Sequence, residues 1–191
     1  MDIIRIFMEE PEKEFHVREI ARITEISPTT TSKILKGYVK KGLLNQRKAF
    51  SHLLFKANLE SKKFKDMKLY YNIKKLRASG IIEYIINQFN EPEAIILFGS
   101  YYKAENIKKS DIDLLVISPI KKELKLEKFE KELGHKIQLF IYSNKEIERM
   151  KEKNKELLNN FINGMIIHGF WEVFRWILQI LLMKEKLGDL Q

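Results

Sequence analysis

The chain has 191 residues, of which 45% are hydrophobic and 32% are charged, and its formal net charge is +9 at pH 7. This length and hydrophobic content suffice for one or two small cores, and we expect two. The chain has no cysteine, which excludes disulfides and thiolate metal sites. Charged residues at Asp2, Arg5 and Glu9 interrupt the leading apolar run of a signal peptide, so we expect a cytoplasmic protein.

The N-terminal third begins with three predicted helices. Apolar residues at helical spacing indicate helices over residues 2–9 and 16–24. Ser27 is the expected N-cap of a third helix, which has Pro28 at its first position and continues to about residue 41. The buried side of this third helix is expected to carry Ile34, Leu35, Tyr38 and Val39.

A basic hairpin is expected after the third helix. Two apolar runs flank a polar turn at residues 45–51, which indicates a two-stranded wing with Arg47 and Lys48 at its tip. No Asp or Glu occurs between Glu25 and Glu60, whereas seven Lys and Arg residues do. Charge of one sign is typical of a surface that binds the phosphate backbone of nucleic acid.

These features resemble the winged helix-turn-helix domains of prokaryotic transcription regulators. The resemblance is carried by residues 17–21 (VREIA), 27–35 (SPTTTSKIL) and 41–44 (KGLL). It implies that the capped helix enters the major groove of double-stranded DNA while the wing contacts adjacent backbone. The implied DNA contacts are Thr29, Thr30, Lys33, Lys36, Lys40, Arg47 and Lys48. Winged helices also serve as protein-docking modules, and the missing acidic residues argue against that alternative.

Residues 59–79 are expected to form a linker helix between two domains. Lysines are interleaved there with apolar residues at spacings of three and four, as in a long amphipathic helix. Such a helix would fix the two domains relative to each other, and Ser79-Gly80 marks its end. Binding to a membrane surface is the alternative for a basic amphipathic helix, and a connector is the commoner role.

The second half of the chain places phosphate-binding and metal-binding groups at the ends of two predicted strands. One apolar run ends at Gly99-Ser100, and a second, residues 111–117, carries Asp111 and Asp113 at its start. Because side chains alternate along a strand, these two carboxylates lie on one side, as a hard cation such as Mg²⁺ requires. Gly99 allows a ligand to approach the backbone, and a helix that opens at Ser100 offers N–H groups to phosphate.

This arrangement resembles the nucleotidyltransferase domain of the polymerase-beta superfamily over roughly residues 79–168. The resemblance implies that Gly99 and Ser100 hold the triphosphate of a nucleoside triphosphate, while Asp111 and Asp113 bind Mg²⁺ or Mn²⁺. The metals would polarise the α-phosphate and stabilise the leaving pyrophosphate during in-line attack by an acceptor hydroxyl. The alternative, a helix cap and a surface Asp pair on an unrelated α/β domain, leaves the apolar residues around both segments unexplained.

The third carboxylate of active family members has no counterpart at the expected place. The next strand, residues 136–142, carries Gln138 in the inward position most like the third acid. An amide can coordinate through its carbonyl oxygen, but it carries no charge and does not accept a proton as a carboxylate does. Three interpretations stay open: a slow transferase with one firmly held metal, a nucleotide-binding domain without turnover, or a third acid from elsewhere. Glu130 and Glu132 are nearby in sequence, although their Lys/Glu-rich stretch favours solvated helix residues.

The C-terminal residues 144–187 are expected to be helical apart from interruptions at Gly164 and Gly169. A short extended segment within residues 161–169 is expected to add an edge strand. An apolar stripe over residues 170–182 is too short and too interrupted to span a bilayer. Its two tryptophans favour a homodimer contact, and a dimer would suit DNA recognition through two half-sites.

Together these expectations describe an α+β protein with four segments. They are a winged helix-turn-helix over residues 1–58, a linker helix over 59–79, a nucleotidyltransferase-like domain with a small mixed sheet over 80–168, and a C-terminal helix over 169–191 for packing or dimerisation. Two functions compete. The first is a DNA-binding transcriptional regulator whose second domain binds nucleotide and metal, which Gln138 favours. The second is an active transferase that modifies a protein, RNA or small-molecule hydroxyl, like antitoxin-type relatives, with a toxin-like protein as partner.

Overall fold

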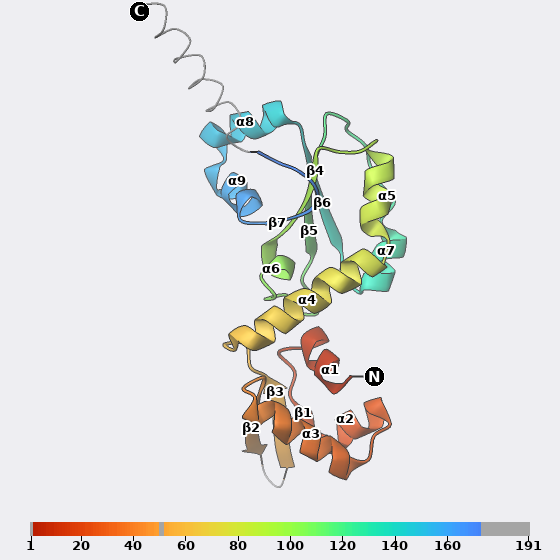
Figure 1. Cartoon of the computed structure of the whole chain (residues 1–191), viewed down its shortest axis with the longest axis vertical. Helices are drawn as coiled ribbons and strands as arrows, with labels where there is room; N and C mark the ends of the chain where they lie inside the picture. The colour runs from red at the N-terminus through yellow and green to blue at the C-terminus, as the bar shows by residue number, and fades with distance from the viewer. Residues whose placement is uncertain (1, 50–51, 173–191) are drawn as a thin grey trace, which may run out of the picture.

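The structure, a computed structural model, describes residues 2–49 and 52–172. Figure 1 shows two folded parts of the chain on either side of one long helix, α4 (Lys62–Ala78). We call residues 2–57 the N-terminal part and residues 79–172 the C-terminal part. Each part buries a set of apolar residues of its own.

The N-terminal part combines helices with a small antiparallel sheet. In the part of the chain that the structure describes, its elements are α1 (Ile3–Glu9), β1 (Phe15–His16), α2 (Val17–Thr24), α3 (Pro28–Lys40), β2 (Leu44–Ala49) and β3 (His52–Ala57). The strand order is β1-β3-β2, and the short strand β1 is not predicted from the sequence. The start of α3 agrees with the prediction, because the Thr30 N–H donates to the Ser27 hydroxyl at 3.3 Å and Pro28 is the first helical residue.

The hairpin after α3 differs from the prediction. A polar turn is expected over residues 45–51, but β2 continues through most of these residues and pairs with β3 along its whole length. Arg47 and Lys48 therefore lie within β2, opposite Leu54 and Leu53, and their prediction at the tip of a wing is wrong. Most residues of β2 are exposed, so its sequence lacks the apolar alternation that reveals a strand.

The C-terminal part is built on a mixed sheet that helices cover on both faces (Figure 1). Its described elements are α5 (Ile81–Gln88), β4 (Ala94–Phe98), α6 (Gly99–Tyr102), β5 (Ile112–Ile117), α7 (Glu127–Leu133), β6 (Ile137–Tyr142), α8 (Asn144–Lys153), α9 (Lys155–Ile162) and β7 (Met165–Gly169). The strand order is β6-β5-β4-β7, with β5 and β6 parallel and the other neighbours antiparallel. The chain is therefore an α+β protein with small sheets, as predicted.

The central strand β5 contributes to two cores because its side chains alternate. Ile112 and Leu114 pack in the core formed with α4, α5 and α7. Leu115 and Ile117 pack in the core formed with α8 and α9. Asp113 alternates with the first pair, so it lies at the start of β5 on the α8–α9 face of the sheet.

Helix α4 packs against both parts of the chain. Its buried side chains are Phe64, Lys68, Asn72 and Leu76, four residues apart on one face. Phe64 belongs to the core of the N-terminal part, and Leu76 belongs to a core of the C-terminal part. The predicted helix is present, and its buried face is apolar at the two ends and polar between them.

The residues after β6 do not form the continuous helix that the sequence predicts. Helix α8 ends before Asn154, whose backbone is not helical, and α9 begins directly after it. The Asn154 side chain caps α9 by accepting a hydrogen bond from the Leu157 N–H at 3.2 Å. The predicted edge strand within residues 161–169 is present as β7, which pairs with β4.

The residues after β7 bear on the predicted dimer contact. Trp171 is 8% exposed and packs in the α8–α9 core of its own chain, so it does not offer a free surface to a second copy. The other tryptophan, Trp176, and the helix predicted up to residue 187 lie outside the described residues. None of the described helices is long and apolar enough to cross a membrane.

Candidate functional site

Gly99 lies directly against the Asp113 carboxylate. The register of β4 and β5 pairs Phe98 with Asp113, so the chain enters α6 beside this side chain. Gly99 has a φ of +69°, in the left-handed region that favours glycine. A Cβ at this position would lie 3.0 Å from the Asp113 Cγ and closer still to its Oδ2. The site therefore needs glycine here both for its backbone conformation and for space.

Asp111 and Asp113 lie two residues apart at the start of β5. Asp111 is exposed and precedes the strand, whereas Asp113 is half-buried within it. Burial raises the pKa of the Asp113 carboxyl above its ordinary value, and the negative charge of Asp111 raises it further. A cation bound by both carboxylates would offset this repulsion.

Gln138 lies beside Asp113 on the neighbouring strand. The parallel strands β5 and β6 pair Asp113 with Gln138, and Gln138 is exposed. The described residues contain no group of three or more His, Cys, Asp or Glu side chains arranged to hold a metal ion. A cation at this position would meet two carboxylates and one amide oxygen, a donor set that fits one divalent cation.

Glu130 is engaged in the fold rather than free to act as a third acid. Its carboxylate accepts hydrogen bonds from the Ile137 N–H at 3.0 Å and from the Lys136 Nζ at 2.8 Å. The hydrogen bond from Lys136 is the larger cause of the lowered pKa of Glu130, and the bond from the Ile137 N–H is the next. Together these bonds connect α7 to the start of β6. Glu132 is an exposed residue of the same helix, as its sequence surroundings predict.

Ser100 lies in α6, a single helical turn of four residues. Its carbonyl oxygen accepts hydrogen bonds from the backbone N–H groups of Glu105 at 2.9 Å and Asn106 at 3.1 Å. These bonds hold the loop after α6 against that helix. Ser100 thus shapes the loop that leads to Asp111, in addition to the phosphate contact that the sequence predicts.

Two buried polar residues of α4, neither of which is predicted from the sequence, hold this same loop. The Lys68 Nζ donates to the Asn106 carbonyl oxygen, and the Asn72 Nδ2 donates to the Tyr101 carbonyl oxygen at 2.8 Å and to the Asn106 Oδ1 at 2.9 Å. Burial lowers the pKa of Lys68 to about 8, and the charge of Glu12 opposes the shift. The recurrence of buried positions every four residues along α4 is the signal that could have identified both residues.

A hollow of about 420 Å³ with a charged lining opens beside Asp111. Its lining combines Lys108, Lys109, Lys131, His135 and Lys136 with the acidic residues Asp111, Glu127 and Glu130. The His135 Nδ1 lies 2.7 Å from the Ser110 carbonyl oxygen, so this nitrogen carries the proton. Burial lowers the pKa of His135, which favours the neutral ring. The hollow is not predictable from the sequence, because its residues come from the ends of β5, β6 and α7.

The residues with predicted DNA contacts are exposed in the N-terminal part. Those of α3 are Thr29, Thr30, Lys33, Lys36 and Lys40, and those of β2 are Arg47 and Lys48. Arg47 is paired within the chain, because its Nε donates to the Glu14 carboxylate at 2.6 Å. This bond raises the pKa of Arg47 and lowers that of Glu14. Lys48 has no such partner among the described residues, so a DNA phosphate could bind Lys48 without breaking an ion pair of β2.

Comparison with known families bears on the C-terminal part. No curated protein matches the chain. Residues 79–168 match the family model described as a nucleotidyltransferase domain. The matched range runs from the end of α4 into β7 and includes Gly99, Asp111, Asp113 and Gln138. This stretch of the chain is therefore similar to a nucleotidyltransferase domain, in agreement with the resemblance seen in the sequence.

Proposed function

We propose that this protein binds double-stranded DNA as a transcriptional regulator, and that its nucleotidyltransferase domain binds a nucleoside triphosphate with Mg²⁺ or Mn²⁺. The proposal is carried by the donor set at the start of β5, where Asp111 and Asp113 lie near Gln138 instead of a third acid. This set retains two carboxylates for a metal and lacks the third on which a two-metal reaction depends. Ligand binding rather than turnover is therefore the principal activity that we assign.

The residues around Gly99 would each bind a different part of the metal–nucleotide complex. When bound, a divalent cation supplies positive charge that offsets the charge of the nucleotide phosphates. Asp111 and Asp113 would hold this cation, and Gly99 leaves the backbone open to a phosphate oxygen. Gln138 does not take up the proton of an acceptor hydroxyl, so a bound nucleotide would persist rather than react.

The proposed DNA-binding domain is a winged helix-turn-helix over residues 1–58. Its support is the combination of a capped, exposed helix α3 with an antiparallel hairpin and no acidic residue between Glu25 and Glu60. Helix α3 would enter the major groove through Thr29 and Thr30, and the lysines of α3 and β2 would contact phosphates. A homodimer would present two copies of α3 to two half-sites, and sedimentation of the protein with and without DNA tests that state.

A paired-variant experiment tests the assignment of two separate sites. Asp111→Ala is expected to abolish Mg²⁺-dependent nucleotide binding and to leave DNA affinity nearly unchanged. Lys33→Ala, together with Lys48→Ala, is expected to have the opposite effect. Equal loss of both functions in either variant, with circular dichroism showing an intact fold, would contradict the proposal of separate sites.

A second candidate function is transfer of a nucleotide to an acceptor, which the lysines of the hollow beside Asp111 favour. Lys136 is paired with Glu130, and the other three lysines, Lys108, Lys109 and Lys131, would attract an anionic acceptor to the carboxylate pair. Incubation with each α-³²P-labelled triphosphate tests this function. Labelling of the chain, an RNA or a small molecule that is lost in Asp113→Asn would establish transfer, and its absence would leave nucleotide binding as the activity.

A further inference from the structure

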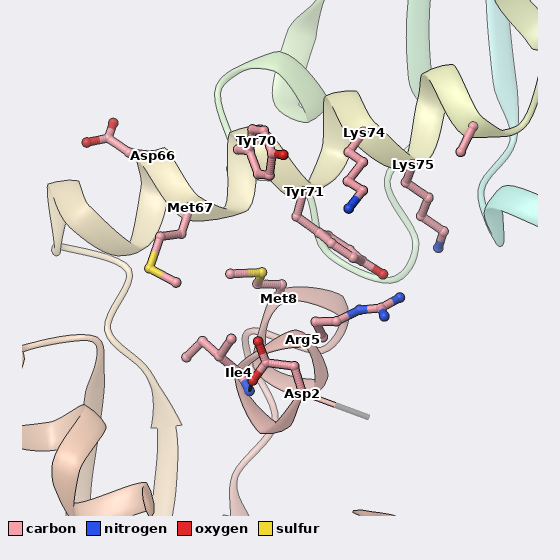
Figure 2. Close-up of a pocket in the computed structure, with 11 residues that line it drawn as sticks. Asp2, Ile4, Arg5, Met8, Asp66, Met67, Tyr70, Tyr71, Lys74 and Lys75 are labelled. Atoms are coloured by element: carbon pink, nitrogen blue, oxygen red, sulfur yellow. Dashed lines mark hydrogen bonds between the residues drawn. The ribbon is translucent and has the colours of Figure 1, made fainter.

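A cavity of about 670 Å³ lies away from the nucleotidyltransferase site, between α1 and α4 (Figure 2). Sites for small molecules typically have volumes of about 300–1,000 Å³ and occur preferentially where domains meet. This cavity meets both criteria, because α1 belongs to the N-terminal part and α4 joins the two parts. Neither the family match, which begins at residue 79, nor the proposed DNA surface includes its lining residues.

One end of the cavity is apolar and aromatic. Ile4 and Met8 of α1 lie opposite Met67 and Tyr70 of α4 (Figure 2). Methionine side chains are flexible and adapt to varied apolar ligands. Tyr70 is 69% exposed, so its ring can stack against a flat ligand.

The other end of the cavity is basic, with Arg5, Lys74 and Lys75 grouped together (Figure 2). The Arg5 guanidinium lies 5.2 Å from the centre of the Tyr71 ring, and the Lys75 Nζ lies 3.9 Å from the Glu9 carboxylate. Lys74 is exposed and has no hydrogen bond or ion pair with any described residue. An anionic group could therefore bind Lys74 without displacing an existing partner.

Two acidic residues, Asp2 and Asp66, also line the cavity. The Asp2 carboxylate accepts hydrogen bonds from the Ile4 N–H and from the Tyr38 hydroxyl, both at 3.3 Å. The Asp66 side chain lies at the far end from Lys75 and points away from α1 (Figure 2). The basic residues are thus gathered at the Lys75 end, whereas Asp66 lies at the apolar end.

We propose that this cavity binds a small molecule with a flat aromatic body and one anionic group. The aromatic body would lie between Met8, Met67 and Tyr70, and the anionic group would lie at Lys74 and Arg5. Because the lining comes from both α1 and α4, the ligand stabilises the packing of the N-terminal part against α4. This site is distinct from the proposed nucleotide site and does not depend on it.

Fluorescence titration of the full chain with 8-anilinonaphthalene-1-sulfonate tests the proposal, since this probe combines aromatic rings with one sulfonate. One bound probe per chain is expected. Tyr70→Ala and Lys74→Glu are each expected to weaken its binding about tenfold, through removal of the stacking ring and reversal of the charge respectively. Both residues are exposed, so neither change removes a buried contact of the fold.

Two matched variants control for non-specific effects. Phe170 is an aromatic residue with the same 69% exposure as Tyr70, and Lys63 is an exposed lysine of α4. Neither lines the cavity, so Phe170→Ala and Lys63→Glu are expected to leave the affinity for the probe unchanged. If the two controls weaken binding as much as the cavity variants, or if none of the four does, the proposal is wrong.

Competition experiments separate the alternatives. Neutral N-phenyl-1-naphthylamine is expected to bind about tenfold more weakly than the sulfonate, because it lacks the anion for Lys74. Excess ATP with Mg²⁺ is expected to leave the probe in place, and displacement would mean that the cavity is a nucleotide site. Probe affinity that falls as protein concentration rises would mean that a second copy of the chain covers the cavity. Either of the last two results would overturn the proposal.

Discussion

At the scale of single residues, the contact of Gly99 with Asp113 constrains the proposed nucleotide site most closely. Any larger residue at position 99 would push its Cβ into the Asp113 carboxylate and would also need a left-handed backbone. The sequence predicts that both residues matter, because a Gly-Ser pair and an Asp-x-Asp pair are local patterns. It does not predict their direct contact, which depends on the register of β4 and β5.

Gly99→Ala is expected to remove Mg²⁺-dependent nucleotide binding, because the new methyl group displaces the Asp113 carboxylate. Gly80→Ala is the matched control, since Gly80 has a φ of +74° but an added Cβ there would have no neighbour within 4 Å. Both variants are expected to lose about 1–2 kcal/mol of stability from the left-handed backbone alone. Calorimetric titration measures the binding, and a Gly99→Ala protein that binds like the Gly80→Ala protein would contradict the proposed role.

The buried amine of Lys68 gives a pH-dependent prediction. Its pKa is about 8 in the folded chain, whereas an unfolded lysine has a pKa near about 10.4. Between these values the unfolded chain binds more protons, so the free energy of unfolding rises as pH increases. The stability of the wild type relative to Lys68→Met is therefore expected to be constant below about pH 7 and to increase from about pH 8 to pH 10. Urea unfolding across this range measures it, and a constant or falling difference would contradict the burial of this amine.

At the scale of secondary-structure elements, a helix or strand is predictable when residues at its ends mark where it begins or stops. An element without such residues is not predictable from the sequence. Ser27 and Pro28 define the start of α3, whose N-cap hydrogen bond is present. The extent of β2 is missed, because a solvated strand has no apolar alternation. The break at Asn154 is missed as well, because asparagine is compatible with a helix until its side chain caps the next one.

The buried face of α4 is the element that sequence analysis describes least completely. Its polar residues hold the loop before Asp111 through atoms distant in sequence. Asn72→Leu is expected to destabilise the protein by about 1–3 kcal/mol, since it leaves the Tyr101 carbonyl unsatisfied. Weaker nucleotide binding is expected to accompany this destabilisation. Asn87→Leu on the exposed side of α5 is the control, and urea unfolding that gives equal effects would disprove the role of Asn72.

Helix α3 yields a prediction about salt dependence. Replacing Lys33, Lys36 and Lys40 with alanine is expected to reduce the slope of log affinity for DNA against log salt by about 0.9 for each DNA phosphate that a lysine no longer neutralises. Lys62→Ala with Lys63→Ala, both exposed on α4, is expected to leave the slope unchanged. Fluorescence anisotropy at several salt concentrations provides the measurement. An unchanged slope in the triple variant would contradict the assignment of α3 to DNA.

At the scale of the whole molecule, α4 separates the proposed DNA surface from the C-terminal part and contacts both parts of the chain (Figure 1). The same helix lines the cavity at α1 and holds the loop that leads to Asp111. A two-part organisation is predictable from the change in charge and motif along the chain. The connection through one polar helix face is not, because it depends on contacts between segments that are remote in sequence.

The most direct measurement is calorimetric titration of ATP, GTP, CTP and UTP into the protein, with Mg²⁺ and with EDTA, for the wild type and Asp113→Asn. Glu83→Gln, an exposed residue of α5, serves as the control for loss of one carboxylate. We expect at least one nucleotide to bind the wild type and the control with Mg²⁺, and none to bind with EDTA or in Asp113→Asn. Binding that persists without Mg²⁺ or in Asp113→Asn, or no binding of any nucleotide to the wild type, would contradict a metal-dependent nucleotide site at Asp113.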